Sequence, residues 1–148
     1  MKKLLMMIAV AAVAGCAQPD RITETASGRP EAMFNNTTPE AVSGKIANGC
    51  ANVGKTVVNM TDNQVVCETI MSLGDTFITE LAIGNAYSTP PRRFSRFTIF
   101  PAGGGMVRVQ LYQWVETQMA FGQTRTMEFN SNQAFNAAMG FLRSIGGK

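Results

Sequence analysis

The feature that most constrains the fold is a long alternation of apolar and polar residues on both sides of a glycine-rich break. The alternating runs are 92–100 and 106–119, and three consecutive glycines occupy 103–105. Alternation with a period of two is typical of strands that bury one face, and a glycine-rich break between such runs indicates a hairpin turn. No helix with a Lys-Ser/Thr pair follows the glycines, so they do not match a phosphate-binding loop. We therefore predict an antiparallel hairpin in which Phe100 pairs with Met106.

The two faces of this hairpin differ in chemistry. The apolar residues predicted to point inward are Phe97, Ile99, Val107, Val109, Leu111 and Val115. The aromatic and arginine residues that dominate the other face are Phe94, Arg96, Arg108, Tyr112 and Trp114. Because Trp, Tyr and Arg most often anchor protein interfaces, we predict that this second set binds a partner. Two alternatives stay open: cross-strand stacking on a solvated face, and cover by a loop or by the N-terminal segment.

Apolar spacing predicts further elements on both sides of the hairpin. Helices are expected over about 39–51 and 130–145, and strands over 55–60, 64–71 and 124–129. Asn130 is predicted to cap the second helix, while Met127 and Phe129 are expected to face the core. Residues 75–84 fit a short helix, which we favour, or a strand. This order predicts an α+β fold: an antiparallel sheet of about five strands, with an N-terminal and a C-terminal helix packed on one face.

The N-terminus has the features of a secretory leader. Two lysines precede an apolar run over 4–14, which is too short to span a bilayer because a spanning helix needs about 20 residues. The run ends in Val-Ala-Gly-Cys at 13–16. These residues resemble the lipobox of bacterial lipoproteins. The resemblance implies that residues 1–15 are a signal peptide, that Cys16 carries a diacylglycerol thioether, and that its new amine is acylated.

The residues after Cys16 bear on location. Ala17 stands where lipoproteins of the enteric type carry an Asp for inner-membrane retention, so the resemblance implies the periplasmic face of the outer membrane. Two or more acyl chains give stable anchorage to that membrane. Residues 16–37 are mostly polar and lack periodicity, so we predict a lipidated cysteine with a flexible tether, in which Met33 and Phe34 dock on the domain. Residues 38–148 then form one periplasmic α+β domain.

Two further cysteines, Cys50 and Cys67, remain in a compartment that favours disulfides. Cys50 lies on the apolar stripe of the first predicted helix, and Cys67 lies in the middle of a predicted strand. We predict a disulfide that joins helix to sheet. The alternative is two buried free thiols, and a redox-active pair is disfavoured because the spacing is not Cys-x-x-Cys.

The composition argues against catalysis. The chain has no histidine, which removes the commonest general base and the commonest metal ligand. The three lysines after the leader lie in no recognisable Ser-Lys motif. Glu116 and Glu128 could approach each other across a hairpin as a carboxylate pair, but we interpret them as surface ion-pairing residues. We therefore predict no enzyme activity, no cofactor and no metal.

The charge is unevenly distributed along the chain. Without the two lysines of the leader, eleven basic residues face ten acidic ones. Residues 16–80 carry a net charge of −4 and residues 81–148 a net charge of +5. This indicates either a basic binding face in the second half or simply two unlike faces of one domain. The predicted location argues against nucleic acid and favours anionic headgroups, glycan or an acidic protein surface.

The order of elements is similar to the helix-grip style of α+β domain. That style also occurs in periplasmic lipoproteins attached to the outer-membrane barrel-assembly machine. The resemblance implies a non-catalytic binding or scaffold module for cell-envelope proteins. One alternative is a carrier that holds a small apolar ligand between sheet and helices, in a pocket lined by methionines. A second alternative is an unrecognised hydrolase.

Overall fold

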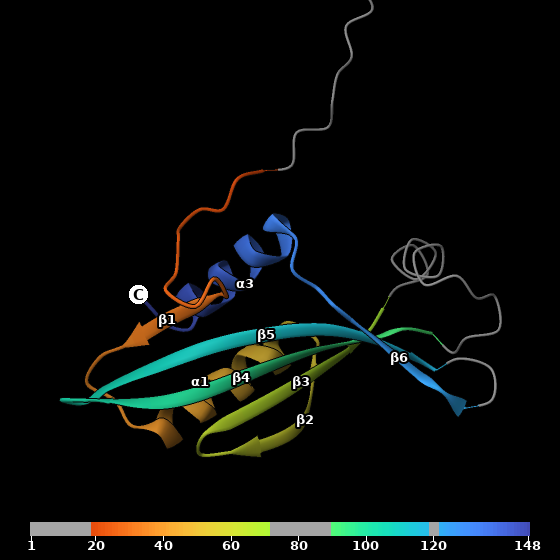
Figure 1. Ribbon diagram of the computed structural model, residues 1–148. Helices are drawn as coiled ribbons and strands as arrows, with labels where there is room; N and C mark the ends of the chain where they lie inside the picture. Colours follow the sequence, from red (N-terminus) through yellow and green to blue (C-terminus); the bar gives the residue numbers. More distant parts are fainter. Residues whose placement is uncertain (1–18, 72–89, 119–121) are drawn as a thin grey trace, which may run out of the picture.

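The computed structural model describes residues 19–71, 90–118 and 122–148, which form a six-stranded antiparallel sheet and two helices (Figure 1). The strands are β1 (Glu31–Phe34), β2 (Thr56–Thr61), β3 (Gln64–Ile70), β4 (Arg92–Gly103), β5 (Met106–Gln118) and β6 (Thr124–Glu128). The helices are α1 (Pro39–Asn52) and α3 (Asn132–Ser144). The predicted α+β class with an antiparallel sheet is confirmed. Among the described residues the sheet has six strands, one more than the number expected, because β1 was not predicted.

Strand β5 pairs with three other strands. The order is β1-β5-β4-β3-β2, and β6 also pairs with β5. Strand β1 pairs with the first part of β5, where Phe34 lies opposite Val107, whereas β6 pairs with its last part, where Glu128 lies opposite Trp114. The two short strands therefore lie one after the other along the same edge of β5.

The apolar core lies on one face of the sheet, between the strands and both helices. All six hairpin residues predicted to point inward are buried, and all but Val115 form a cluster with Val42 and Ile46 of α1 and with Phe135 and Leu142 of α3. Met127 lies on the same side of the sheet as Val115, its partner across the strands, but it is 39% exposed. The expectation that it joins the core is wrong, because β6 extends past the helices (Figure 1).

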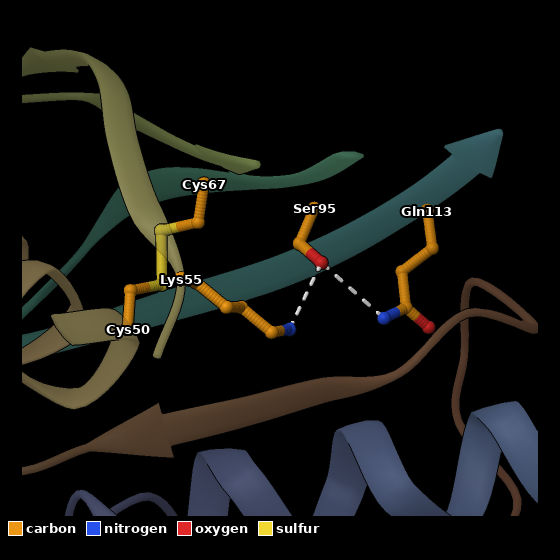
Figure 2. Close-up of a disulfide and its surroundings, with 5 residues drawn as sticks. All are labelled: Cys50, Lys55, Cys67, Ser95 and Gln113. Carbon is orange, nitrogen blue, oxygen red and sulfur yellow. Dashed lines mark hydrogen bonds between the residues drawn. A yellow bond between two sulfur atoms is a disulfide. The ribbon is translucent and has the colours of Figure 1, made fainter. Parts of the chain in front are cut away.

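The predicted disulfide between Cys50 and Cys67 is present and joins α1 to β3 (Figure 2). Both residues are fully buried in the core. The bridge spans a sequence separation of 17, which corresponds to a stabilisation of about 3 kcal/mol in the chain-entropy model. The disulfide therefore fixes the C-terminal end of α1 against the middle of strand β3.

Both helices begin at a hydroxyl cap. Thr38 accepts a hydrogen bond from the backbone N–H of Ala41, and Pro39 occupies the first turn. The cap of α3 is Ser131, whose Oγ accepts from the N–H of Ala134 at 3.1 Å. The prediction of Asn130 was wrong by one residue. The side chain of Asn130 instead accepts a hydrogen bond from Arg21.

The register of the central hairpin also differs from the prediction. Strand β4 continues beyond Phe100 to Gly103, which pairs with Met106, and a bulge lies between Pro101 and Gly103. Gly104 and Gly105 form the turn with φ of 59° and 72°. Two consecutive positive φ values give the turn that matches the twist of a hairpin, and glycine adopts them without strain. As a result each residue of β4 pairs two positions further along β5 than predicted.

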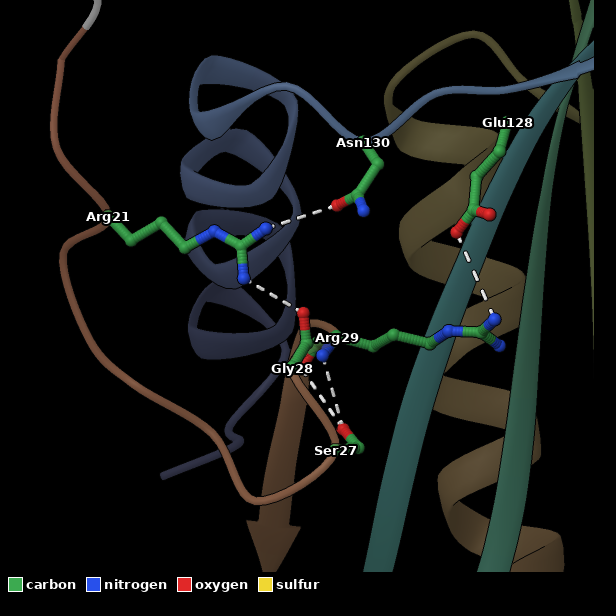
Figure 3. Close-up of polar contacts among 6 residues, drawn as sticks. All are labelled: Arg21, Ser27, Gly28, Arg29, Glu128 and Asn130. Carbon is green, nitrogen blue, oxygen red and sulfur yellow. Dashed lines mark hydrogen bonds and ion pairs between the residues drawn. The ribbon is translucent and has the colours of Figure 1, made fainter.

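The N-terminal segment is more ordered than predicted. A flexible tether over the whole of 16–37 is wrong for β1, whose Phe34 is 2% exposed and so docks as expected. Upstream of β1, the Arg21 guanidinium lies 4.5 Å from the Phe135 ring and donates to the carbonyl of Gly28 (Figure 3). The backbone N–H of Ile22 donates to the side chain of Asn136. The segment therefore packs on α3 from Arg21 onward.

Two predictions lie outside the described residues: the helix or strand over 75–84, and the lipobox at 13–16. Within the described part of the chain, no helix is long and apolar enough to cross a membrane.

Candidate binding surface

Four of the five predicted partner-binding residues lie together on the outer face of the sheet, opposite both helices. Phe94 pairs with Trp114 and Arg96 pairs with Tyr112 across β4 and β5. Arg108 lies further along β5, where its guanidinium is 4.9 Å from the Phe100 ring. The hairpin register thus gathers three aromatic rings and one guanidinium, and it places Arg108 apart from them.

The three rings form a continuous row. The centroids of Phe94 and Trp114 are 5.2 Å apart with planes inclined by 15°, and those of Trp114 and Tyr112 are 5.4 Å apart with planes inclined by 27°. Offset stacking at such separations is favourable beyond the area that it buries. The rings therefore restrain one another. Phe94 is itself buried, with 9% of its surface exposed, so Tyr112 and Trp114 are the rings that are partly exposed.

Guanidinium groups lie over this row at both ends and in its middle. Arg92 lies 5.4 Å from the Phe94 ring, and Arg29 lies 4.6 Å from the Tyr112 ring. Arg96 lies 5.2 Å from Tyr112 and 5.8 Å from Trp114. All are within the range of a cation–π attraction. We call this set the arginine–aromatic face: Arg29, Arg92, Phe94, Arg96, Tyr112 and Trp114.

Carboxylates surround the arginine–aromatic face. Both guanidinium nitrogens of Arg92 that face Glu68 donate to its carboxylate, and the Nη2 donor lies 2.6 Å from Oε2. These hydrogen bonds raise the pKa of Arg92 against the opposing effect of desolvation. Arg29 reaches Glu128 at 3.9 Å (Figure 3), and Trp114 Nε1 donates to Glu116 at 2.6 Å. Glu116 and Glu128 thus each have a partner of their own, Trp114 and Arg29.

Arg96 is the exception within the arginine–aromatic face. No carboxylate of the described residues forms an ion pair with its guanidinium. Its Nε is buried and lacks a hydrogen-bond partner among those residues. A buried donor without an acceptor costs free energy, so this guanidinium is the group that would gain most from an incoming acceptor.

Arg29 and Arg92 were missed as members of this face. The sequence could have indicated Arg92, because it precedes Phe94 and Arg96 by two and four positions and so shares their side of the strand. The sequence could not have indicated Arg29, because its position depends on the pairing of β1 with β5. Both stacking and partial cover by the N-terminal segment, the two alternatives left by the sequence, are present in the structure.

The space between sheet and helices does not favour the apolar-ligand carrier. The core residues of this region are at most 4% exposed and pack against one another. A cavity of about 130 Å³ lies between the sheet and α3, but Lys55 and Arg93 line it. Binding sites for drug-sized ligands usually have about 300–1,000 Å³ and mostly apolar walls.

Among the described residues, no group of three or more His, Cys, Asp or Glu side chains is placed to hold a metal ion. No protein-family model matches the chain, and no curated protein or solved structure is significantly similar to it.

Proposed function

We propose that this protein is a lipid-anchored, non-catalytic binding module of the outer membrane, whose arginine–aromatic face contacts another protein of the cell envelope. The observation that carries the proposal is the row of three stacked rings with guanidinium groups over it, on the sheet face that neither helix covers. Aromatic rings and arginines of this kind contribute most of the binding energy in protein interfaces.

The contacts within the face favour binding because they reduce its cost. Association loses side-chain freedom, which for rotamer-rich side chains is worth about 0.5–1.5 kcal/mol each. Here Trp114 is already held by two ring contacts and by the carboxylate of Glu116, and Arg92 by Glu68. A partner therefore meets side chains that have lost much of this freedom during folding.

The free guanidinium indicates the chemistry of the partner. Arg29 and Arg92 have carboxylate partners within the chain, whereas Arg96 has none among the described residues. An Asp or Glu of the partner, placed over Tyr112, would complete this pattern with a charge-assisted hydrogen bond. We expect the partner to present an acidic side chain in an apolar surrounding.

The proposed anchor would hold the domain close to the membrane. The chain packs on α3 from Arg21 onward, so only about five residues separate it from Cys16. Five residues span at most about 17 Å, far less than the reach of a tether that extends to residue 37. The partner is therefore expected to be a membrane protein or a protein at the membrane surface.

Affinity capture with a matched charge variant tests the binding proposal. Arg96→Gln removes the free guanidinium, whereas Arg143→Gln removes an exposed charge from α3. The wild type and Arg143→Gln should retain the same envelope protein after crosslinking in cells, and Arg96→Gln should lose it while keeping its disulfide. Equal recovery with both variants would remove the arginine–aromatic face from the proposal.

The anchor is tested separately. Cys16→Ala should abolish metabolic labelling with palmitate and release the protein from the membrane fraction, because no thioether can form at an alanine. A variant that is still labelled and still sediments with the outer membrane would contradict lipidation at Cys16. That result would not bear on the proposal that the arginine–aromatic face binds a partner.

A further inference from the structure

The inner face of the sheet carries a small cavity with two cationic side chains and no carboxylate among its described lining residues. The cavity has a volume of about 130 Å³ and lies between α3 and the strands β4 and β5. Its polar side chains are Lys55, Arg93 and Gln113. Its apolar lining consists of Phe97, Leu111, Phe129, Ala134, Ala137, Ala138 and Phe141.

The cationic side chains are held in place by elements of the fold. Lys55 follows α1, and its backbone N–H donates to the carbonyl of Cys50 at 2.9 Å, so the disulfide fixes its position (Figure 2). The Lys55 ammonium lies 5.9 Å from the Phe141 ring, and the Arg93 guanidinium lies 4.3 Å from the Phe129 ring. The site therefore has a rigid frame that links three regions of the sequence.

The donors of this site outnumber its acceptors. Ser95 Oγ accepts from Lys55 Nζ and from Gln113 Nε2, both at 3.4 Å (Figure 2). Ser95 is 1% exposed, and no described group accepts its hydroxyl proton in the hydrogen bonds of the structure. Arg93 Nε is buried and also lacks an acceptor among the described residues. The N–H donors of Lys55, Arg93 and Gln113 thus border a space that holds no described acidic side chain, and Ser95 lies behind Lys55 and Gln113.

Two like charges in this position are unfavourable without a counter-charge. Burial, and after it the positive charge of Arg93, lower the pKa of Lys55. Neither side chain forms an ion pair with a described carboxylate, although their neighbours on the outer face do. An anion in the cavity would remove the repulsion and supply the missing acceptors.

We propose that the cavity binds a small organic anion, with its carboxylate between Lys55 and Arg93 and a short apolar tail against Ala138 and Phe141. The volume admits a short-chain monocarboxylate and excludes a long acyl chain. The apolar part of the lining favours an organic acid over inorganic phosphate, because phosphate has no apolar group to place there. This site lies on the opposite side of the sheet from the arginine–aromatic face, so it does not depend on the proposed partner.

A titration with short acids tests this inference. The soluble form of the chain, with Cys16 replaced by Ala, is titrated with acetate, butyrate and hexanoate, and amide chemical shifts of Ser95 and Gln113 are followed by NMR. Butyrate should give saturable shifts at these residues, whereas butanol at the same concentrations should give none. Saturation by inorganic phosphate but by no carboxylate would overturn the assignment of an organic acid.

Two variants and a control make the test specific. Lys55→Met should weaken butyrate binding about tenfold or more, since it removes a charged hydrogen-bond donor, and Lys55→Arg should restore most of the affinity. Lys55→Met removes a buried charge and is therefore expected to stay folded. Arg143→Gln removes one positive charge, as Lys55→Met does, but at an exposed position of α3 outside the cavity. This variant should bind butyrate like the wild type. Equal affinity of Lys55→Met and the wild type would overturn the proposal.

Discussion

Neighbouring residues of β4 place their cationic side chains in opposite environments. Arg92 and Arg96 point to the outer face, where they lie over stacked rings and where Arg92 has a carboxylate partner. Arg93 points to the inner face, where it shares a cavity with Lys55 and no described carboxylate pairs with it. The ion pair of Arg92 therefore contributes to the stability of the folded domain, whereas the positive charges of Lys55 and Arg93 repel each other without a described counter-charge.

The largest effect is expected from Trp114→Ala on the outer face. It removes the ring that stacks on both Phe94 and Tyr112, together with the hydrogen bond to Glu116. We expect a loss of about 3 kcal/mol in the free energy of unfolding, measured by urea denaturation. Trp114→Phe keeps a ring at this position and should lose about 1 kcal/mol. A Trp114→Ala variant as stable as the wild type would mean that the rings do not support one another.

Glu68→Gln tests the ion pair of the outer face. The carboxylate of Glu68 is largely buried and accepts two hydrogen bonds from Arg92, whose side chain is about half exposed. The amide keeps the shape but loses the charge, so we expect a loss of about 2 kcal/mol from denaturation curves. Glu24→Gln, at an exposed position, is the control and should leave the curve unchanged within about 0.5 kcal/mol. A similar loss of stability in both variants would mean that the ion pair between Glu68 and Arg92 does not stabilise the fold.

Lys55→Met should raise the free energy of unfolding, whereas the substitutions on the outer face lower it. It replaces a largely buried ammonium with an apolar side chain of similar length, and we expect a gain of about 1 kcal/mol at pH 7. The pKa of Lys55 in the folded chain is below its ordinary value of 10.5, so the unfolded chain binds more protons between the two pKa values. The stability of the wild type therefore rises with pH in this window. The gain of the variant should shrink as pH approaches 10.5, and a gain independent of pH would contradict this cause.

The smallest effect is expected from Arg29→Ala. Its guanidinium lies over Tyr112 and forms an ion pair with Glu128, but both partners of that ion pair are about 40% exposed. Exposed pairs of this kind contribute about 0.5–1 kcal/mol, and less at high salt. Denaturation at low and at high salt concentration measures the total loss of stability and the share of it that salt screens. A loss above about 2 kcal/mol would show that the N-terminal segment holds the outer face together.

The sequence was sufficient where a pattern acts locally. Alternation in β4 and β5 predicted six buried apolar residues of that hairpin correctly, although it placed Phe94 on the outer face, where it is buried as well. The apolar stripe of α1 placed Cys50 close enough to the sheet to bridge to Cys67. It was insufficient where pairing depends on distant parts of the chain. The four residues of β1 have too little pattern to indicate a strand, and only their pairing with β5 shows one.

The same limit explains the site residues that were missed. The cavity joins Lys55 and Arg93, which lie 38 positions apart, through the pairing of β3 with β4 and the packing of α3. The hairpin register was predicted incorrectly by two positions because three consecutive glycines allow several turns, and the turn determines which residues of β4 meet Tyr112 and Trp114. Composition therefore identified the chemistry of the outer face, but the structure was needed to determine which side chains touch.

The most direct test of the central claim compares crosslinking from the two sides of the domain. A photo-reactive amino acid is placed at Thr98 on the outer face of β4, or at Arg143 on the exposed side of α3, in the lipidated protein in living cells. We predict one discrete protein adduct from Thr98 that is absent from Arg143, and its loss when Arg96→Gln is added. Identical adducts from both positions, or an adduct from Arg143 alone, would contradict the account.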